Sequence, residues 1–88
     1  MDPIDVNNEH VTALRAQVDG VLRDIDEGLS MHDFRVVDGA RQINLIFDVV
    51  VPYSYGESAK RELLIQIYDR LKAIDTRYNP VVTLEHQL

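Results

Sequence analysis

Residues 30–52, SMHDFRVVDGARQINLIFDVVVP, contain two runs rich in β-branched and aromatic residues on either side of Asp38-Gly39. An Asp-Gly pair between two such runs is typical of a β-hairpin whose turn has two residues. The second run ends at Pro52, because proline has no N–H to donate to a sheet. The stretch therefore predicts two antiparallel strands, with a register that this short turn would set.

Because side chains alternate along a strand, the predicted register divides them between two faces of the sheet. The apolar face, which we expect to be the core face, holds His32, Phe34, Val36, Ile43, Leu45, Phe47, Val49 and Val51. The more polar face holds Asp33, Arg35, Gln42, Asn44, Ile46, Asp48 and Val50. Asp48 interrupts an apolar run, and a buried carboxylate without a partner is costly. On the polar face the carboxylate of Asp48 can stay hydrated, so this cost does not arise. Arg35 lies on the same face and could form an ion pair with Asp48, although it is not directly opposite.

A first helix is expected before the hairpin. Apolar residues recur at helical spacing from Val11 to Ile25 and form one stripe. Residues 1–7 read as an extended lead-in, and Asn7 or Asn8 is a suitable helix N-cap.

A second helix and a third strand are expected after the hairpin. Ser54 and Glu57 have the spacing of a capping box, and apolar residues then recur at helical spacing from Leu63 to Ile74. Residues 81–87, VVTLEHQ, predict a short closing strand. One face of that strand would carry Val82, Leu84 and His86.

The predicted element order is αββαβ in a single domain of residues 1–88. The helix between the second and third strands allows these two strands to run parallel with a right-handed crossover. The result is an α+β, two-layer sandwich with a three-stranded mixed sheet and two helices on one face. The other face stays uncovered and half apolar, which suggests a partner, most simply a second copy.

The composition excludes several classes of function. The net charge is −6, with nine lysine and arginine residues against fifteen acidic ones, which disfavours binding to nucleic acid. Without cysteine the chain has no disulfide, thiolate metal site or thiol nucleophile. No run is long enough to cross a membrane, so we expect the chain as given to be soluble. No motif supplies a nucleophile with a matched base, so we expect no enzyme activity.

Two histidines lie at the ends of predicted strands. His32 opens the first strand and His86 closes the last. Each is either an ordinary, partly exposed histidine or a metal ligand, and residue type leaves both roles open. Together with Asp and Glu, they would suit a divalent ion such as Zn²⁺ or Mn²⁺.

The order αββαβ, with SMHDFRVVDG, then INLIFDVVVPY and a closing VVTLEH, resembles the cytoplasmic C-terminal domain of cation diffusion facilitator (CDF) transporters. The resemblance covers essentially the whole chain. It implies a ferredoxin-like, metallochaperone-like fold that forms a homodimer and regulates transport without catalysing a reaction. The family exports divalent cations, commonly Zn²⁺, through a membrane domain in the inner or plasma membrane. Residues 1–7 would then be the lead-in from that membrane domain.

The resemblance also implies a set of metal ligands. His32 falls at the histidine of the family's HDLR motif, Asp48 at about a middle-strand histidine, and His86 near a closing-strand acid. Ala16 and Leu84 stand where many members have histidine, so the ligand set is depleted. The predicted faces place His32 and His86 together and Asp48 opposite, so we do not expect one chain to bring all three to one ion. A site spanning two chains stays open.

Two alternatives to a metal-sensing domain stay open, the first of them because the ligand set is depleted. The chain could be a structural dimerisation module that needs no metal. It could also be a free-standing, ferredoxin-like sensor of a small ligand.

Overall fold

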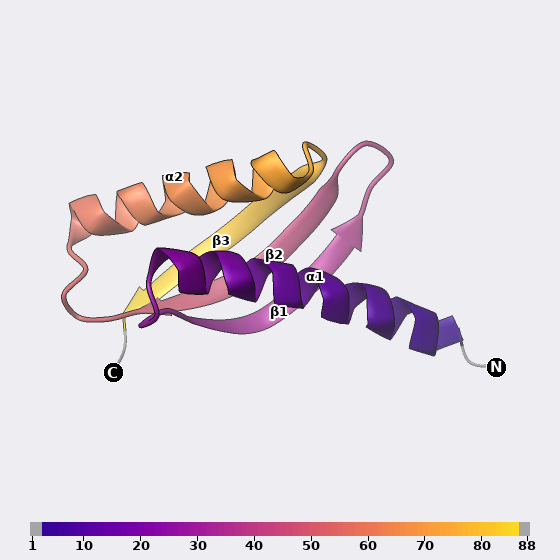
Figure 1. The fold of residues 1–88 in the computed structure, drawn as a ribbon, viewed down its shortest axis with the longest axis horizontal. Coiled ribbons are helices and arrows are strands. Elements are labelled where there is room, and N and C mark those ends of the chain that lie inside the picture. Colours follow the sequence, from indigo (N-terminus) through magenta and orange to yellow (C-terminus); the bar gives the residue numbers. More distant parts are fainter. Residues whose placement is uncertain (1–2, 87–88) are drawn as a thin grey trace.

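The computed structural model describes residues 3–86, which form five elements in the order αββαβ (Figure 1). These are α1 (Pro3–Ile25), β1 (Ser30–Asp38), β2 (Ile43–Val51), α2 (Glu57–Ile74) and β3 (Tyr78–His86). Both helices lie on the same face of the sheet, and the sheet forms the second layer. The predicted two-layer, ferredoxin-like α+β sandwich is therefore confirmed.

The sheet has the strand order β1-β2-β3, with β2 in the centre. β1 and β2 are antiparallel, as expected of a hairpin. β2 and β3 are parallel and joined through α2, which confirms the mixed sheet.

The core lies between the sheet and the helices. The inward face of β2 is almost completely buried and consists of Leu45, Phe47, Val49 and Val51. The stripe that α2 buries against it is Leu63, Ile67 and Leu71, at the spacing of one turn. α1 adds Leu14, Val18, Val21 and Leu22. Full burial of a side chain such as Phe47 contributes about 1.5–3 kcal/mol relative to exposure. The predicted core face of β2 and the stripe of α1 are confirmed. The stripe of α2 is confirmed from Leu63 to Leu71, whereas Ile74 at its predicted end is exposed.

α1 begins at Pro3, so the prediction of an extended lead-in over residues 1–7 is wrong for residues 3–7. Proline suits the first turn of a helix, because the N–H that it lacks would have no partner within the helix. The helix therefore needs no cap at Asn7 or Asn8. Residues 1–2 lie outside the described part of the chain.

The hairpin loop is longer than predicted. Asp38 pairs with Ile43, so the loop comprises residues 39–42, closed by a 2.7 Å hydrogen bond from the Gly39 N–H to the Gln42 carbonyl. The predicted two-residue turn would need positive φ angles at its centre. No glycine among residues 3–86 has a positive φ. Gly39 serves a close approach instead, since a Cβ there would lie 3.0 Å from the Gln42 carbonyl oxygen.

A β-bulge changes the face of β1. His32 pairs with Asp48 and Arg35 with Ile46, so three steps along β1 match two along β2. Asp33, in the bulge, adopts a positive φ of 54°. The extra residue allows both Met31 and Phe34 to pack against the core. His32 is consequently moved to the uncovered face, and its predicted place on the core face is wrong.

Two element boundaries also differ from the prediction. The N-cap of α2 is Gly56, in an extended conformation and without a side-chain hydrogen bond, so the capping box at Ser54 and Glu57 does not form. A turn closed by the Tyr55 N–H and the Pro52 carbonyl precedes the helix instead. β3 begins at Tyr78, earlier than expected, because an edge strand tolerates a proline that has no N–H to donate.

Candidate functional site

The uncovered face of the sheet, which we call the open face, carries side chains from all three strands. The ladders place His32, Asp48 and Thr83 side by side in one row across the sheet. The neighbouring row consists of Arg35, Ile46 and Val81. The outer rows are Ser30, Val50 and Glu85 at one end and Val37, Asn44 and Asn79 at the other. Charged and polar groups thus surround a few branched apolar side chains.

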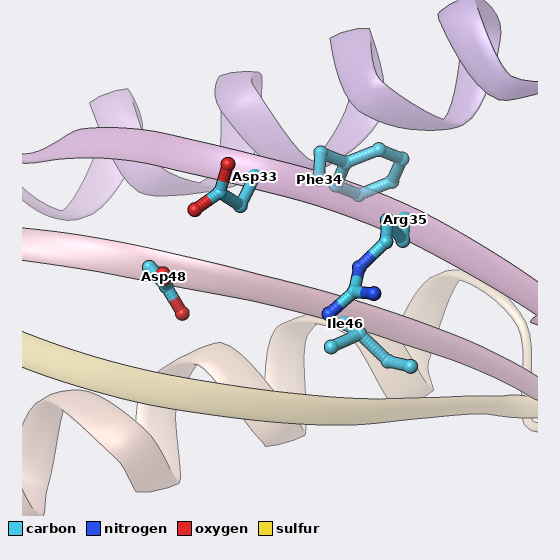
Figure 2. Close-up of a pocket in the computed structure, with 5 residues that line it drawn as sticks. All are labelled: Asp33, Phe34, Arg35, Ile46 and Asp48. Atoms are coloured by element: carbon cyan, nitrogen blue, oxygen red, sulfur yellow. The ribbon is translucent and has the colours of Figure 1, made fainter.

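The bulge creates a hollow between the two middle rows. Its volume is about 490 Å³, and its lining consists of Asp33, Phe34, Arg35, Ile46 and Asp48. Figure 2 shows the carboxylates of Asp33 and Asp48 on neighbouring strands and the guanidinium of Arg35 extending across Ile46. Two carboxylates and one guanidinium therefore share a concave part of the open face.

These charges are not paired with one another. The ion pairs among residues 3–86 join Arg23 to Asp19, Lys60 to Glu57 and Arg77 to Asp75, all at the surface. None of them involves Asp48 or Arg35. Asp48 therefore forms no ion pair within residues 3–86. Asp48 is half-buried, whereas Asp33 and Arg35 are exposed.

His86 lies on the opposite side of the sheet, at the end of β3. It pairs with Val51, whose side chain is buried in the core. Its Nε2 lies 3.0 Å from the Tyr55 carbonyl oxygen and donates a hydrogen bond to it. Its ring also stacks on Tyr53, with 6.2 Å between the ring centres. These contacts join the end of β3 to the loop before α2.

The three predicted ligands therefore divide differently from the expectation. His32 and Asp48 lie together on the open face, and His86 is the one apart. The prediction that His32 and His86 share a face is wrong, because it ignored the bulge. Within residues 3–86, no group of three or more His, Cys, Asp or Glu side chains could hold a metal ion. In one chain, the open face offers a divalent cation the imidazole of His32 and the carboxylate of Asp48.

A second polar cluster, between Asp26 and Tyr55, was not predicted. The Tyr55 hydroxyl donates a 2.7 Å hydrogen bond to Asp26 Oδ2, and the Gly28 N–H donates one of 2.8 Å to Oδ1. The bond from Tyr55, followed by that from Gly28, lowers the pKa of Asp26. Burial, followed by the bond to Asp26, raises the pKa of Tyr55 to about 12. No local spacing signals this pair, since 29 positions separate its members.

This cluster connects the turn after α1 to the loop before α2 (Figure 1). The same loop holds His86 through the Tyr55 carbonyl. Tyr55 therefore ties both helix connections and the end of β3 together. These contacts, which join three separate segments of the chain, indicate a structural role.

The fold and the open face define a class of protein: a small ferredoxin-like domain with one helical layer and one uncovered sheet. Two solved structures share this fold. One is a structure of CzrB, a candidate zinc transporter. The match covers 91% of this chain and 95% of the CzrB chain, with 19% sequence identity and a TM-score of 0.78. The other is the cytosolic domain of a cation diffusion facilitator family protein, 14% identical over 98% of this chain and 94% of its own, with a TM-score of 0.68.

At these identities the likeness establishes the fold, which is that of CDF cytosolic domains, as the sequence resemblance predicted. No protein-family model and no curated protein matches the sequence. Among residues 3–86, neither helix is apolar enough over its length to span a membrane.

Proposed function

We propose that this chain is the cytoplasmic regulatory domain of a CDF cation efflux transporter, and that it dimerises and senses a divalent cation such as Zn²⁺. The observation that carries the proposal is the structural likeness to CDF cytosolic domains over 91–98% of the chain. The HDFR motif at residues 32–35 supports it independently of the backbone. The role is regulatory and not catalytic, and the domain works beside a membrane domain of the same transporter.

The electrostatics of the domain suggest how a cation would act. Each protomer has a formal charge of −6, so two protomers repel each other when they approach. A cation bound by His32 and Asp48 would reduce the negative charge of the open face. Metal would then bind the dimer more tightly than the separated protomers and would shift the equilibrium towards the dimer. A metal sensor needs such a difference in affinity between its two states.

Calorimetry with Zn²⁺, combined with solution scattering of the same samples, tests this proposal. We expect Zn²⁺ to bind with measurable heat and to shift the scattering profile towards a more compact dimer. Absence of both changes would exclude metal sensing while leaving the fold unaffected. The residues encoded immediately before Met1 test family membership separately, since a CDF transporter would have membrane-spanning helices there.

A second candidate is a dimerisation module that works without metal. The observation in its favour is that Tyr55 holds His86 on the helix side, which leaves the pair His32 and Asp48 as candidate ligands on the open face. This candidate predicts that the dimer dissociation constant is the same in chelator and in Zn²⁺. It also predicts that His32→Ala leaves that constant unchanged under both conditions.

A further inference from the structure

The two edges of the sheet differ in how well they are protected against the addition of another strand. β1 and β3 are the edge strands, and an edge strand presents unpaired N–H and C=O groups. The bulge at Asp33 interrupts the outer edge of β1, and bulges oppose the addition of a strand. In β3, Pro80 lacks an N–H but lies near the start of the strand, so it protects only that end. Residues 81–86 of β3 contain neither a proline nor a bulge.

The backbone groups of Val82 and Leu84 point towards this free edge. Ile43 of β2 pairs with Tyr78, and its N–H donates a 2.7 Å hydrogen bond to the carbonyl of Arg77. In a parallel ladder every second residue bonds to the neighbouring strand, so the odd-numbered residues of β3 face β2. The even-numbered residues then direct their N–H and C=O groups outwards. Among residues 3–86, no further strand lies beside β3 to receive them.

The flank of α2 above this edge is apolar and partly exposed. α2 contacts β3, whereas α1 contacts β1, so one flank of α2 faces α1 and the other lies at the free edge of β3 (Figure 1). Glu62 and Gln66 lie on the first flank, in a hollow shared with the last residue of α1. Helical spacing places Leu64 and Tyr68, which we call the apolar pair, on the other flank. They are 38% and 45% exposed, and a strand added to β3 would cover them.

Two basic side chains lie at the ends of the apolar pair. Arg61 precedes Leu64 by about one turn of α2, and Lys72 follows Tyr68 by about one turn. The Lys72 Nζ lies 5.4 Å from the centre of the Tyr68 ring, which places this cation on the same flank. The chain as a whole has a net charge of −6, so the flank is a local exception. It would attract a partner that carries carboxylates.

The same charges disfavour a second copy of the chain at this edge. Arg61 and Leu84 each lie about 20 Å from the turn that joins α2 to β3. Two copies that paired their β3 strands around Leu84 would therefore bring Arg61 close to the partner's Arg61. Like charges that face each other oppose association, so a partner of different sequence and opposite charge fits better.

We propose that residues 81–86 of β3 accept an extended segment of a partner protein as a fourth, antiparallel strand, with apolar residues at alternate positions and carboxylates beyond them. Strand addition of this kind takes its affinity from backbone hydrogen bonds and its specificity from alternate side chains. The two residues of the segment that face Val82 and Leu84 would exchange hydrogen bonds with them and point towards the helical layer. There they would contact the apolar pair, and the carboxylates would approach the two basic side chains. The inference does not depend on the proposed function, since the open face stays free.

The test is fluorescence anisotropy with a labelled peptide, Asp-Thr-Val-Thr-Ile-Thr-Asp, in which valine and isoleucine take the two apolar positions. We expect this peptide to bind the wild-type chain, and replacement of both aspartates by lysine to weaken binding by at least about tenfold. N-methylation of valine and isoleucine should abolish binding, because their N–H groups face β3. N-methylation of the threonine between them should leave binding unchanged, because that N–H faces away from β3.

Variants of the protein locate the contact. Leu64→Glu should weaken peptide binding by at least about tenfold, because it places a charge against the apolar positions of the peptide. Ile65→Glu is the matched control and should change nothing, because Ile65 is 55% exposed on the side of α2 that points away from the sheet. Amide hydrogen exchange at Val82 and Leu84 should also slow when the peptide binds.

Several results would overturn the proposal. If the peptide methylated at valine and isoleucine binds as tightly as the unmodified one, the contact is not strand pairing. If Leu64→Glu binds the peptide as tightly as the wild type, the peptide lies elsewhere. Absence of binding at millimolar peptide also overturns it, and so does self-association of the wild type that Leu64→Glu abolishes, which would assign this edge to a second copy. The methylated peptides are compared on the wild-type chain, so a folding defect in a variant does not decide the outcome.

Discussion

His32 lies directly opposite Asp48 across the ladder between β1 and β2, on the face of the sheet that no helix covers. This pairing exists because the bulge adds one residue to β1 between His32 and Arg35. It brings together an imidazole and a carboxylate that the regular register would have placed on opposite faces. The open face therefore holds two candidate ligands on adjacent strands.

The first prediction concerns Zn²⁺ binding. His32→Ala should weaken it by at least the roughly 10–100-fold that loss of an outer-shell partner costs, because the open face loses a direct ligand, its imidazole. His86→Ala should leave it unchanged, because His86 lies on the other side of the sheet, bonded to Tyr55. Calorimetry on both variants makes the comparison. An equal loss in His86→Ala would move the metal site away from the open face.

The second prediction concerns the bulge. Asp33 has a φ of 54°, which a branched side chain adopts at a cost of about 1–2 kcal/mol. Asp33→Val should lower the free energy of unfolding by that amount, whereas Asp33→Gly should not lower it. Urea unfolding of both variants measures the difference. If valine were tolerated as well as glycine, the left-handed conformation at this position would be wrong.

The third prediction concerns the core. Phe47 is 1% exposed and contacts the ring of Phe34, with 6.0 Å between the ring centres. Phe47→Ala should lower the free energy of unfolding by about 3–5 kcal/mol, because it removes apolar contacts and leaves a cavity. Ile65→Ala is the control, since Ile65 is 55% exposed on α2 and should change stability by less than about 0.5 kcal/mol. Thermal unfolding of both proteins compares them.

The fourth prediction concerns the pH dependence of the bond between Tyr55 and Asp26. The pKa of Tyr55 is raised from 10.0 to about 12, so the folded state favours the neutral phenol. Its contribution to stability is complete below pH 10 and is lost as the pH rises through about 12. Alkaline titration of tyrosine absorbance should show a late phase that Tyr55→Phe reduces. Burial also raises the pKa of Tyr78, so Tyr78 contributes to that phase in both proteins. A wild type whose four tyrosines all titrate near their usual pKa would contradict it.

Asp26 has the opposite dependence on pH. Its pKa is lowered below 3.8 in the folded state, so its contribution is present above pH 3.8 and is lost as the pH falls through the folded value. Asp26→Asn should therefore reduce the stability difference between neutral and acidic pH. An acid unfolding curve with the same midpoint and slope as the wild type would show that this carboxylate does not contribute.

Most of the fold was predictable because its signals are local. Apolar spacing identified both helices, and strict alternation identified the buried face of β2. The order of these elements then permitted few arrangements, so the mixed sheet with two helices on one face followed. The helix start at Pro3 differs from the prediction because a proline disfavours helical backbone only at the residue before it and suits the first turn of a helix itself.

The candidate site was less predictable, because it depends on register. Met31 and Phe34 are three positions apart, and both pack against the core. That spacing is inconsistent with regular alternation and was the available signal for a bulge. Asp33 and the hollow beside it were missed for the same reason.

Local residue spacing was thus sufficient for the element order, the helical stripes and the position of Asp48 on the open face. The tertiary structure decided that His32 joins Asp48, that His86 is separated from both, and that Tyr55 meets Asp26. The physical reason is that packing Met31 and Phe34 together against the core requires one extra residue in β1. Because strand side chains alternate with a period of two, that single residue moves every side chain before it to the other face.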